Sequence, residues 1–250
     1  MKNNFYVVLL ASLFAVLVGC QNAQGQQGEN EKALSGAKAK TVSATQKTQL
    51  AQVNPSKTKQ AANDKTAGTQ KMPAGKFTVR LETTKGNIDV EVDPALAPLG
   101  AARFFELVTN GYYTDVAFFR VIPGFMAQVG LSGDPAQNRV WRQKRISDDP
   151  VKGTNARGMV TFATAGPNSR TTQFFINFKN NGNLDRMGFA PFGQVTGESL
   201  SVVDSLYGGY GEGAPRGRGP AQGRIHAEGN TYLKKDFPKL DYIKRARVLK

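Results

Sequence analysis

The sequence predicts an all-β fold with two helices, arranged as an antiparallel sandwich or barrel. From residue 76 onward, short β-like runs follow one another, with glycine and proline turns between them. Only two stretches have the apolar spacing of a helix. Two helices are too few to cover both faces of a parallel sheet, so the strands are expected to pair antiparallel.

A hairpin is expected at the start of the ordered region. The segment 76–93 alternates apolar and polar residues on both sides of a turn at 84–86. Alternate side chains point to opposite faces of a strand. The side chains that share the apolar faces are Phe77, Val79, Leu81, Ile88, Val90 and Val92.

Helices are predicted at two places. Pro98 suits the first turn of the first helix, and Asn110-Gly111 ends it. Its apolar stripe is Ala101, Phe104, Phe105 and Val108. The second helix falls within 199–209, with Ser199 or Ser201 as the candidate N-cap.

Further strands are predicted from five short runs and a closing segment. The runs are VAFFRVI (116–122), FMAQVG (125–130), GMVTFATA (158–165), QFFINF (173–178) and FAPFGQV (189–195), and LDYIKRARVL (240–249) closes the fold. The glycine-rich segment 208–230 is expected to be an ordered or semi-ordered surface loop.

The composition excludes several kinds of catalytic site. The chain has 250 residues, a net charge of +14, one Cys and one His. A His/Cys metal cluster needs more ligands than this. A Ser-His-Asp triad would have to use His226, which lies in a polar, glycine-rich segment without a nucleophile elbow. We therefore expect no metal and no cofactor, and interpret His226 as a surface-loop histidine.

Residues 1–19 have the features of a signal peptide. Lys2 precedes the apolar run 5–19, which is short for a membrane-spanning helix. LVGC resembles the lipobox of bacterial lipoproteins, whose cysteine is acylated, with palmitate among its chains, and becomes the new N-terminus. Cys20 is the predicted lipidation site, and an ordinary signal peptide with an incidental Cys is the alternative. Gln21 in place of Asp favours the periplasmic face of the outer membrane if the bacterium is Gram-negative.

Residues 20–75 are predicted to be a disordered basic tether. They contain no aromatic residue and few aliphatic ones, so they cannot bury enough apolar surface to offset chain entropy. From residue 21 the segment carries eight lysines against three acidic residues. Such a tether can contact anionic headgroups or cell-wall polymers, or it can be a solvated spacer. Residues 76–250 are expected to form one domain.

Three blocks of this domain resemble the cyclophilin-type peptidyl-prolyl isomerase family. FFRVIPGFMAQVG (118–130) resembles the family signature, in which Phe, His and the key Arg precede an aliphatic-Pro-Gly-Phe-Met-x-Gln-x-Gly run. GMVTFATAGPNSRTTQFFINF (158–178) and LDRMGFAPFGQV (184–195) resemble two later blocks. The resemblance implies an eight-stranded antiparallel β-barrel capped by a helix at each end.

The implied reaction is rotation about Xaa-Pro peptide bonds. Amide resonance creates the barrier, and no covalent bond has to break. A guanidinium can hydrogen-bond to the freed nitrogen lone pair of the twisted amide, while an apolar wall holds the proline ring. The resemblance assigns catalysis to Arg120, Phe125 and Gln128. It assigns substrate binding to two groups. Met126, Phe175, Leu184 and Phe189 form the proline pocket together with Phe125, and Ala163, Thr164 and Gln173 contact the peptide backbone. Taken singly, such residues are more often solvated or core side chains.

The sequence departs from the family pattern at three positions. Phe119 stands where His usually precedes the Arg. Asn183 stands where Trp is common, which predicts weak cyclosporin binding. Phe189 aligns near another position that is commonly His.

Two functions are consistent with these residues. The first is a lipid-anchored, extracytoplasmic isomerase that assists the folding of envelope or secreted proteins. The second is a chaperone-like binding module that grips Xaa-Pro segments with little turnover. Both take proline-containing polypeptides as partners, and we expect a monomer. RGRG at 216–219 suggests nucleic-acid binding, but the export signal argues against a nucleic-acid partner.

Overall fold

The computed structural model describes residues 71–249. The predicted signal peptide, Cys20 and the tether as far as residue 70 lie outside this range. Within it, no helix has the length and apolar character needed to cross a membrane. Met72, at the end of the predicted tether, packs partly buried against the main core.

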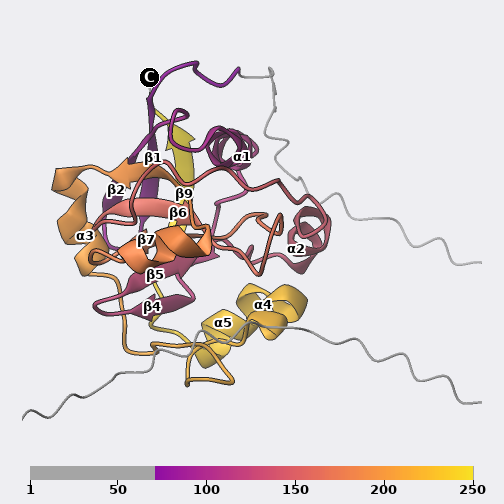
Figure 1. Cartoon of the computed structure of the whole chain (residues 1–250). Coiled ribbons are helices and arrows are strands. Elements are labelled where there is room, and N and C mark those ends of the chain that lie inside the picture. The colour runs from indigo at the N-terminus through magenta and orange to yellow at the C-terminus, as the bar shows by residue number, and fades with distance from the viewer. Residues whose placement is uncertain (1–70, 250) are drawn as a thin grey trace, which may run out of the picture. The chain divides into compact units, whose positions relative to one another are not determined.

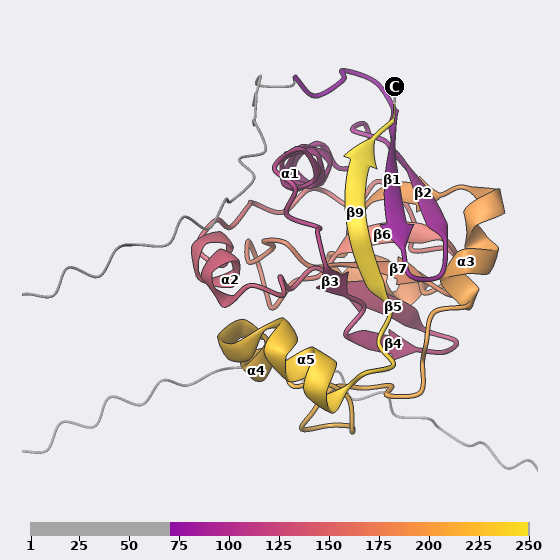
Figure 2. The same cartoon turned by 180° about the vertical axis from the view of Figure 1, so that it is seen from behind.

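In the described part of the chain, nine strands form one antiparallel sheet in the order β3-β9-β1-β2-β8-β6-β7-β5-β4. Their bounds are β1 Phe77–Thr83, β2 Asn87–Val92, β3 Val116–Ala117, β4 Arg120–Ile122, β5 Met126–Val129, β6 Met159–Phe162, β7 Phe174–Asn177, β8 Pro191–Val195 and β9 Tyr242–Val248. The predicted hairpin is confirmed as β1 and β2, and the predicted closing strand is β9. β9 inserts between β1 and β3, so the two ends of the domain meet in one sheet (Figure 2).

The sheet curls because its two edge strands are neighbours in the chain. Only Phe118 and Phe119 separate β3 from β4, which limits the gap between these edges to about 11 Å along the chain. β3 and β4 do not pair, so the expected closed eight-stranded barrel is wrong in strand number and closure. The predicted strand 116–122 is divided at the two phenylalanines into β3 and β4.

Between residues 71 and 249, five α-helices and two 3₁₀ helices accompany the sheet. The helices α1 to α5 are labelled in Figure 1. They are α1 Pro98–Thr109, α2 Pro135–Trp141, η1 Gly182–Met187, η2 Gly197–Ser199, α3 Leu200–Asp204, α4 Gln222–Glu228 and α5 Asn230–Asp236. Both predicted helices exist, as α1 and α3, but α2, α4 and α5 were missed. Ser199 occupies the N-cap position of α3 without capping it, because its hydroxyl accepts a bond from Asp89 N at 2.9 Å.

The main core fills the inside of the curled sheet. Its centre is a group of buried rings from α1, the α1–β3 connection, β7 and β8. Phe104 lies 5.4 Å from Phe174 and 5.0 Å from Phe192 between ring centroids, and Tyr113 lies 5.3 Å from Phe174. These rings join α1 to the sheet, which is the packing that an apolar helix stripe predicts.

A second cluster lies outside the sheet under α4 and α5. Its buried members are Ala117, Phe119, Leu131, Ile225, Tyr232, Leu233 and Leu240, with Tyr210, Phe237 and Tyr242 packed against them. Helices of seven residues are too short to be stable alone. Packing on this cluster therefore explains why residues predicted as surface loop form α4.

The N-terminus of α1 is fixed by a buried ion pair. Asp149 accepts the backbone N–H of Leu99 at 2.9 Å and that of Gly100 at 2.8 Å. It also lies 3.2 Å from Arg170, and both side chains of the pair are almost fully buried. The carboxylate satisfies two of the N–H groups that a helix start leaves without partners.

We expect Asp149→Ala to lower the free energy of unfolding by about 3 kcal/mol or more, because it leaves Arg170 buried without this partner and uncaps α1. Asp204→Ala also removes a carboxylate, but from an exposed ion pair with Arg157. It should lower the free energy of unfolding by less than about 1 kcal/mol. Urea unfolding of the full chain measures both. Equal losses for the two variants would contradict this role of Asp149.

Candidate active site

The register of three strands gathers the predicted site on the outer face of the sheet. Arg120 on β4 pairs with Gln128 on β5, and Ile122 pairs with Met126. Gln128 in turn lies opposite Phe175 on β7. Because side chains alternate between the faces of a strand, these five residues share one face. The residues between them along each strand pack into the main core.

A break between β3 and β4 turns Arg120 out of the core. Val116 and Phe118 pack into the main core, and Phe119 packs into the second cluster. Continued alternation would place residue 120 inside. Instead Val121 is in the main core, so the pattern shifts by one at the break and Arg120 faces outward.

Two side chains hold the guanidinium of Arg120. Its Nε and Nη2 donate to the two carboxylate oxygens of Glu212 at 2.7 and 2.6 Å. Its Nη1 donates to Oε1 of Gln128 at 3.0 Å, and Gln128 donates to Oε1 of Gln173 at 2.9 Å. This chain of bonds fixes the plane of the guanidinium, whose side chain is 22% exposed.

Glu212 is ionised in this pair. Partial burial of the carboxyl raises its pKa, but the hydrogen bonds and charge of Arg120, with the N–H of Gly213, outweigh burial and hold the pKa below its ordinary value of 4.5. The ion pair therefore persists at neutral pH and is lost only as the pH falls through this lowered pKa.

An apolar group, the site cluster, lies beside the guanidinium. Its buried members are Met126, Phe175 and Leu184, with Ile122, Phe125, Ala163 and Phe189 partly buried against them. The ring centroid of Phe125 is 6.0 Å from Cζ of Arg120, and the rings of Phe175 and Phe189 meet edge to face at 5.7 Å. Every residue predicted for the proline pocket is in this group.

Hydrogen bonds position the two sides of the cluster. Asn181 donates from its side chain to the carbonyl of Phe125 at 2.9 Å, which joins the β4–β5 turn to the start of η1. Asp185 on η1 accepts bonds from Thr154 and Asn155 at 2.6 and 2.7 Å. These contacts hold Leu184 against Met126 and Phe175.

The residues predicted to contact a peptide backbone lie at different places. Ala163 belongs to the site cluster, and Gln173 is bonded to Gln128. The hydroxyl of Thr164 instead bonds to Gly166 and Ser169 within its own loop. The structure therefore brings Ala163 and Gln173 to the site and leaves Thr164 at its margin.

The departures from the family pattern have structural explanations at two positions. Phe119 is 1% exposed in the second cluster, where an apolar ring suits the packing better than a histidine would. Asn183 is exposed on η1 beside buried Leu184, so no indole covers that side of the site cluster.

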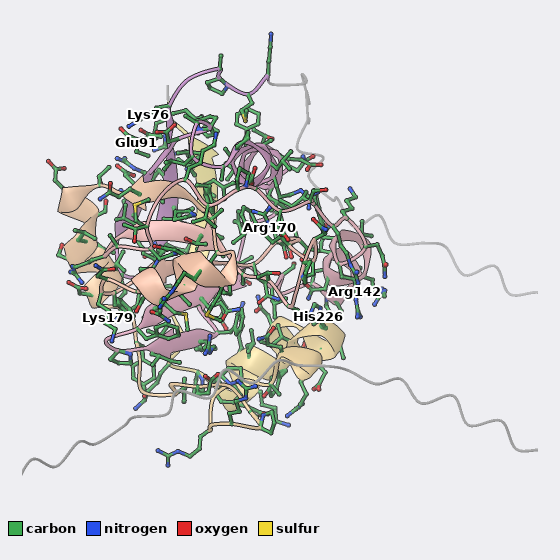
Figure 3. All side chains as sticks on the ribbon, in the orientation of Figure 1. Lys76, Glu91, Arg142, Arg170, Lys179 and His226 are labelled. Carbon is green, nitrogen blue, oxygen red and sulfur yellow. The ribbon has the colours of Figure 1, made fainter. Side chains whose placement is uncertain are left out.

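His226 is wrongly predicted as a loop residue. It lies half-buried on α4, and its Nδ1 is buried without a hydrogen-bond partner. Burial and the nearby charge of Arg142 lower the pKa of this imidazole. Both residues are labelled in Figure 3. Within residues 71–249, no group of three or more His, Cys, Asp or Glu side chains could hold a metal ion.

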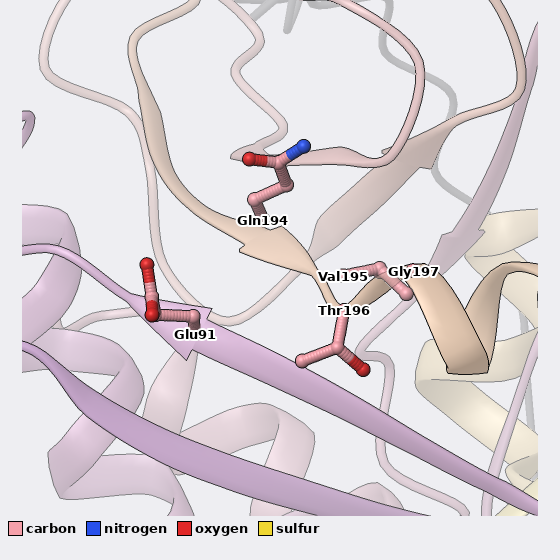
Figure 4. Close-up of a pocket in the computed structure, with 5 residues that line it drawn as sticks. All are labelled: Glu91, Gln194, Val195, Thr196 and Gly197. Carbon is pink, nitrogen blue, oxygen red and sulfur yellow. The ribbon is translucent and has the colours of Figure 1, made fainter.

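A shallow hollow elsewhere on the sheet does not belong to this site. It lies between β2 and β8 and is lined by Glu91, Gln194, Val195, Thr196 and Gly197 (Figure 4). β6, β7 and β5 separate β8 from β4 in the sheet. The hollow shares no residue with the site cluster.

Glu212 is the site residue that the sequence did not reveal. It lies 92 positions from Arg120, in a glycine-rich segment without a recognisable motif. It is the single acidic residue between 208 and 227. This is the one feature of the local sequence that could have indicated a role for Glu212.

The chain matches the family model described as cyclophilin type peptidyl-prolyl cis-trans isomerase/CLD over residues 78–221. Peptidyl-prolyl cis-trans isomerase-like 3 from Rhizopus delemar is 36% identical over 141 residues, which are 52% of this chain and 81% of the relative. Peptidyl-prolyl cis-trans isomerase A from Dickeya dadantii is 36% identical over 140 residues, which are 51% of this chain and 70% of that protein.

A solved structure shows the same fold. The crystal structure of a cyclophilin type peptidyl-prolyl cis-trans isomerase from Cryptosporidium parvum matches with a TM-score of 0.51 at 20% identity, and covers 70% of this chain and 98% of that one. The family model ends at residue 221, immediately before α4.

The lowered pKa of His226 gives a pH-dependence of stability. The unfolded chain binds a proton near the ordinary pKa of 6.5, and the folded chain binds it at lower pH, so stability falls as the pH decreases through this range. We expect His226→Gln to lose less stability than the wild type between pH 8 and pH 5.5. Urea unfolding at both pH values measures this. An equal loss of stability in the two proteins would show that burial does not lower the pKa of His226.

Proposed function

Because the chain belongs to the cyclophilin-type peptidyl-prolyl cis-trans isomerase family and is such an isomerase, we propose that Arg120 is its catalytic group. The proposal rests mainly on one observation: an oriented guanidinium lies beside an apolar cluster on the same face of β4, β5 and β7. This combination suits a reaction in which an amide twists and no covalent bond is broken.

In the proposed mechanism, the proline ring packs into the site cluster and stays fixed. The wall against which the ring rests consists of Phe125, Met126, Phe175, Leu184 and Phe189, which belong to one cluster. The acyl group before the proline then rotates. Holding the ring removes motion that does not lead to rotation, which is catalysis by positioning.

The guanidinium stabilises the twisted amide. As resonance is lost, the proline nitrogen becomes pyramidal and its lone pair becomes a better hydrogen-bond acceptor. Arg120 can donate to that lone pair, because a guanidinium stays charged and carries five N–H groups. The bond is stronger in the twisted state than in the planar one, which is the condition for acceleration. Gln128 orients Arg120 through its bond to Nη1.

We further propose that the substrates are envelope or secreted proteins. The apolar run 5–19 followed directly by Cys20 supports export and acylation, and the basic segment after it supports an extended attachment to a bacterial membrane. Slow Xaa-Pro isomerisation, which takes tens to hundreds of seconds uncatalysed, limits folding in any compartment. Exposed Asn183 supports weak cyclosporin binding, because no large ring covers that edge.

Arg120→Ala should lower kcat/KM for a proline tetrapeptide by about 10²–10³, the loss that follows removal of one preorganised donor from an active site. A protease-coupled assay on the full chain measures it. Arg157→Ala removes an exposed arginine that pairs with Asp204, and should leave the rate unchanged. A wild-type rate in Arg120→Ala would refute the assignment. Peptide binding without turnover in the wild type would favour a chaperone-like binding module.

Cys20→Ala should move the protein from the membrane fraction to the soluble fraction of the bacterium, because the acyl chains provide the anchor. Immunoblotting of the two fractions measures the distribution. Cys20→Ala protein that stays in the membrane fraction would exclude anchoring through this cysteine.

A further inference from the structure

Glu212 is tied to the catalytic guanidinium by both of its carboxylate oxygens. The bonds run to Nε and Nη2 of Arg120 at 2.7 and 2.6 Å, a forked geometry in which rotation of either group breaks a bond. The acid side chain is 33% exposed, and the arginine side chain 22% exposed. The pair is therefore partly sheltered from water, and its geometry is favourable.

The pair leaves donors of Arg120 available to a substrate. A guanidinium has five N–H groups. Glu212 takes one at Nε and one at Nη2, and Gln128 takes one at Nη1. The second Nη1 donor meets only the weak acceptor Sδ of Met126, at 3.9 Å, on the side of the site cluster. Glu212 thus holds one edge of the guanidinium while Nη1 faces the apolar pocket.

The backbone around Glu212 is fixed to the strand that carries Arg120. Gly211 forms an isolated antiparallel bridge with Val121, the residue after Arg120. Gly208 packs so closely on Pro123 that a Cβ there would lie 2.8 Å from the proline ring. The glycine-rich loop, residues 207–221, is therefore attached to β4 and to the β4–β5 turn.

The same loop is closed on itself at Glu212. Gly219 donates its N–H to the carbonyl of Glu212 at 2.8 Å, and Gly213 donates to its Oε1 at 2.9 Å. Gly217 approaches the Glu212 carbonyl so closely that a Cβ would lie 2.2 Å from the oxygen, so this position requires glycine. The glycines of the segment allow a compact turn that fixes one acidic side chain.

Two further contacts fasten the loop to the domain. Buried Asp241 accepts the N–H of Tyr207 at 2.7 Å and also accepts the hydroxyl of Thr84 at 2.7 Å. Tyr210 packs on the second cluster, with its ring 5.0 Å from that of Phe237. A loop held by strand, turn and cluster is a fixed part of the site.

We propose that Glu212 is a positioning residue for the isomerase reaction. It holds the guanidinium of Arg120 in the orientation that directs Nη1 at the twisted amide, so that Arg120 need not be ordered when the peptide binds. The inference rests on the proposed role of Arg120. If Glu212 has this role, the glycine-rich loop serves to hold Glu212 in place. α5, which lies outside the matched family range, then supports the loop through its packing with Tyr210.

The test measures kcat, KM and peptide affinity of full-chain variants. We expect Glu212→Ala to lower kcat by about tenfold or more, equivalent to about 1.4 kcal/mol of transition-state stabilisation. Peptide affinity should change little, because the site cluster is untouched. Glu212→Gln keeps one acceptor for Arg120, so its kcat should fall less than that of Glu212→Ala. Glu198→Gln removes an exposed negative charge on η2 and should behave as the wild type.

The double variant separates positioning from other roles. In an Arg120→Ala background, Glu212→Ala should cause no further loss of kcat, because its effect passes through Arg120. A further loss, or a Glu212→Gln rate equal to or above that of the wild type, would overturn the inference. An inactive wild type would instead overturn the role of Arg120. Urea unfolding of each variant tests whether a lower kcat comes from partial unfolding of the protein.

Discussion

Cross-strand register among β4, β5 and β7 is the constraint on which the site depends. It places Arg120 opposite Gln128, and Gln128 opposite Phe175, so one face receives a charged donor, its orienting amide and an aromatic wall. A slip of one residue in either pairing would send these side chains into the core. The core prevents that slip, because the residues that alternate with them along the strands are apolar and buried.

The second cluster, which lies outside the sheet, also helps to position the site. Phe119 occupies it from the β3–β4 link, and the helices after the matched family range cover it. The apolar packing that replaces the usual histidine is therefore the packing that supports the glycine-rich loop. Through this loop the domain brings Glu212, distant in sequence, to Arg120. Phe119 and the ion pair of Glu212 with Arg120 therefore depend on the same packing.

The parts of the structure that depend on local sequence pattern could be predicted from the sequence. Alternation located the hairpin of β1 and β2, and Pro98 and Asn110 marked the ends of α1. The family blocks located the site cluster, including Phe189. The short helix α4 escaped prediction because the tertiary contacts of Ile225 stabilise it. Glu212 escaped because ion pairs across 92 residues leave no periodic signal.

We propose that proline isomerisation occurs on the outer face of β4, β5 and β7. Exchange NMR of a proline peptide with the isotope-labelled full chain tests it directly, because it reports cis-trans exchange and the amides that the peptide contacts. We expect accelerated cis-trans exchange together with shifted amide resonances in these strands and in η1. Exchange accompanied by shifts confined to the hollow between β2 and β8, or no acceleration at all, would contradict it.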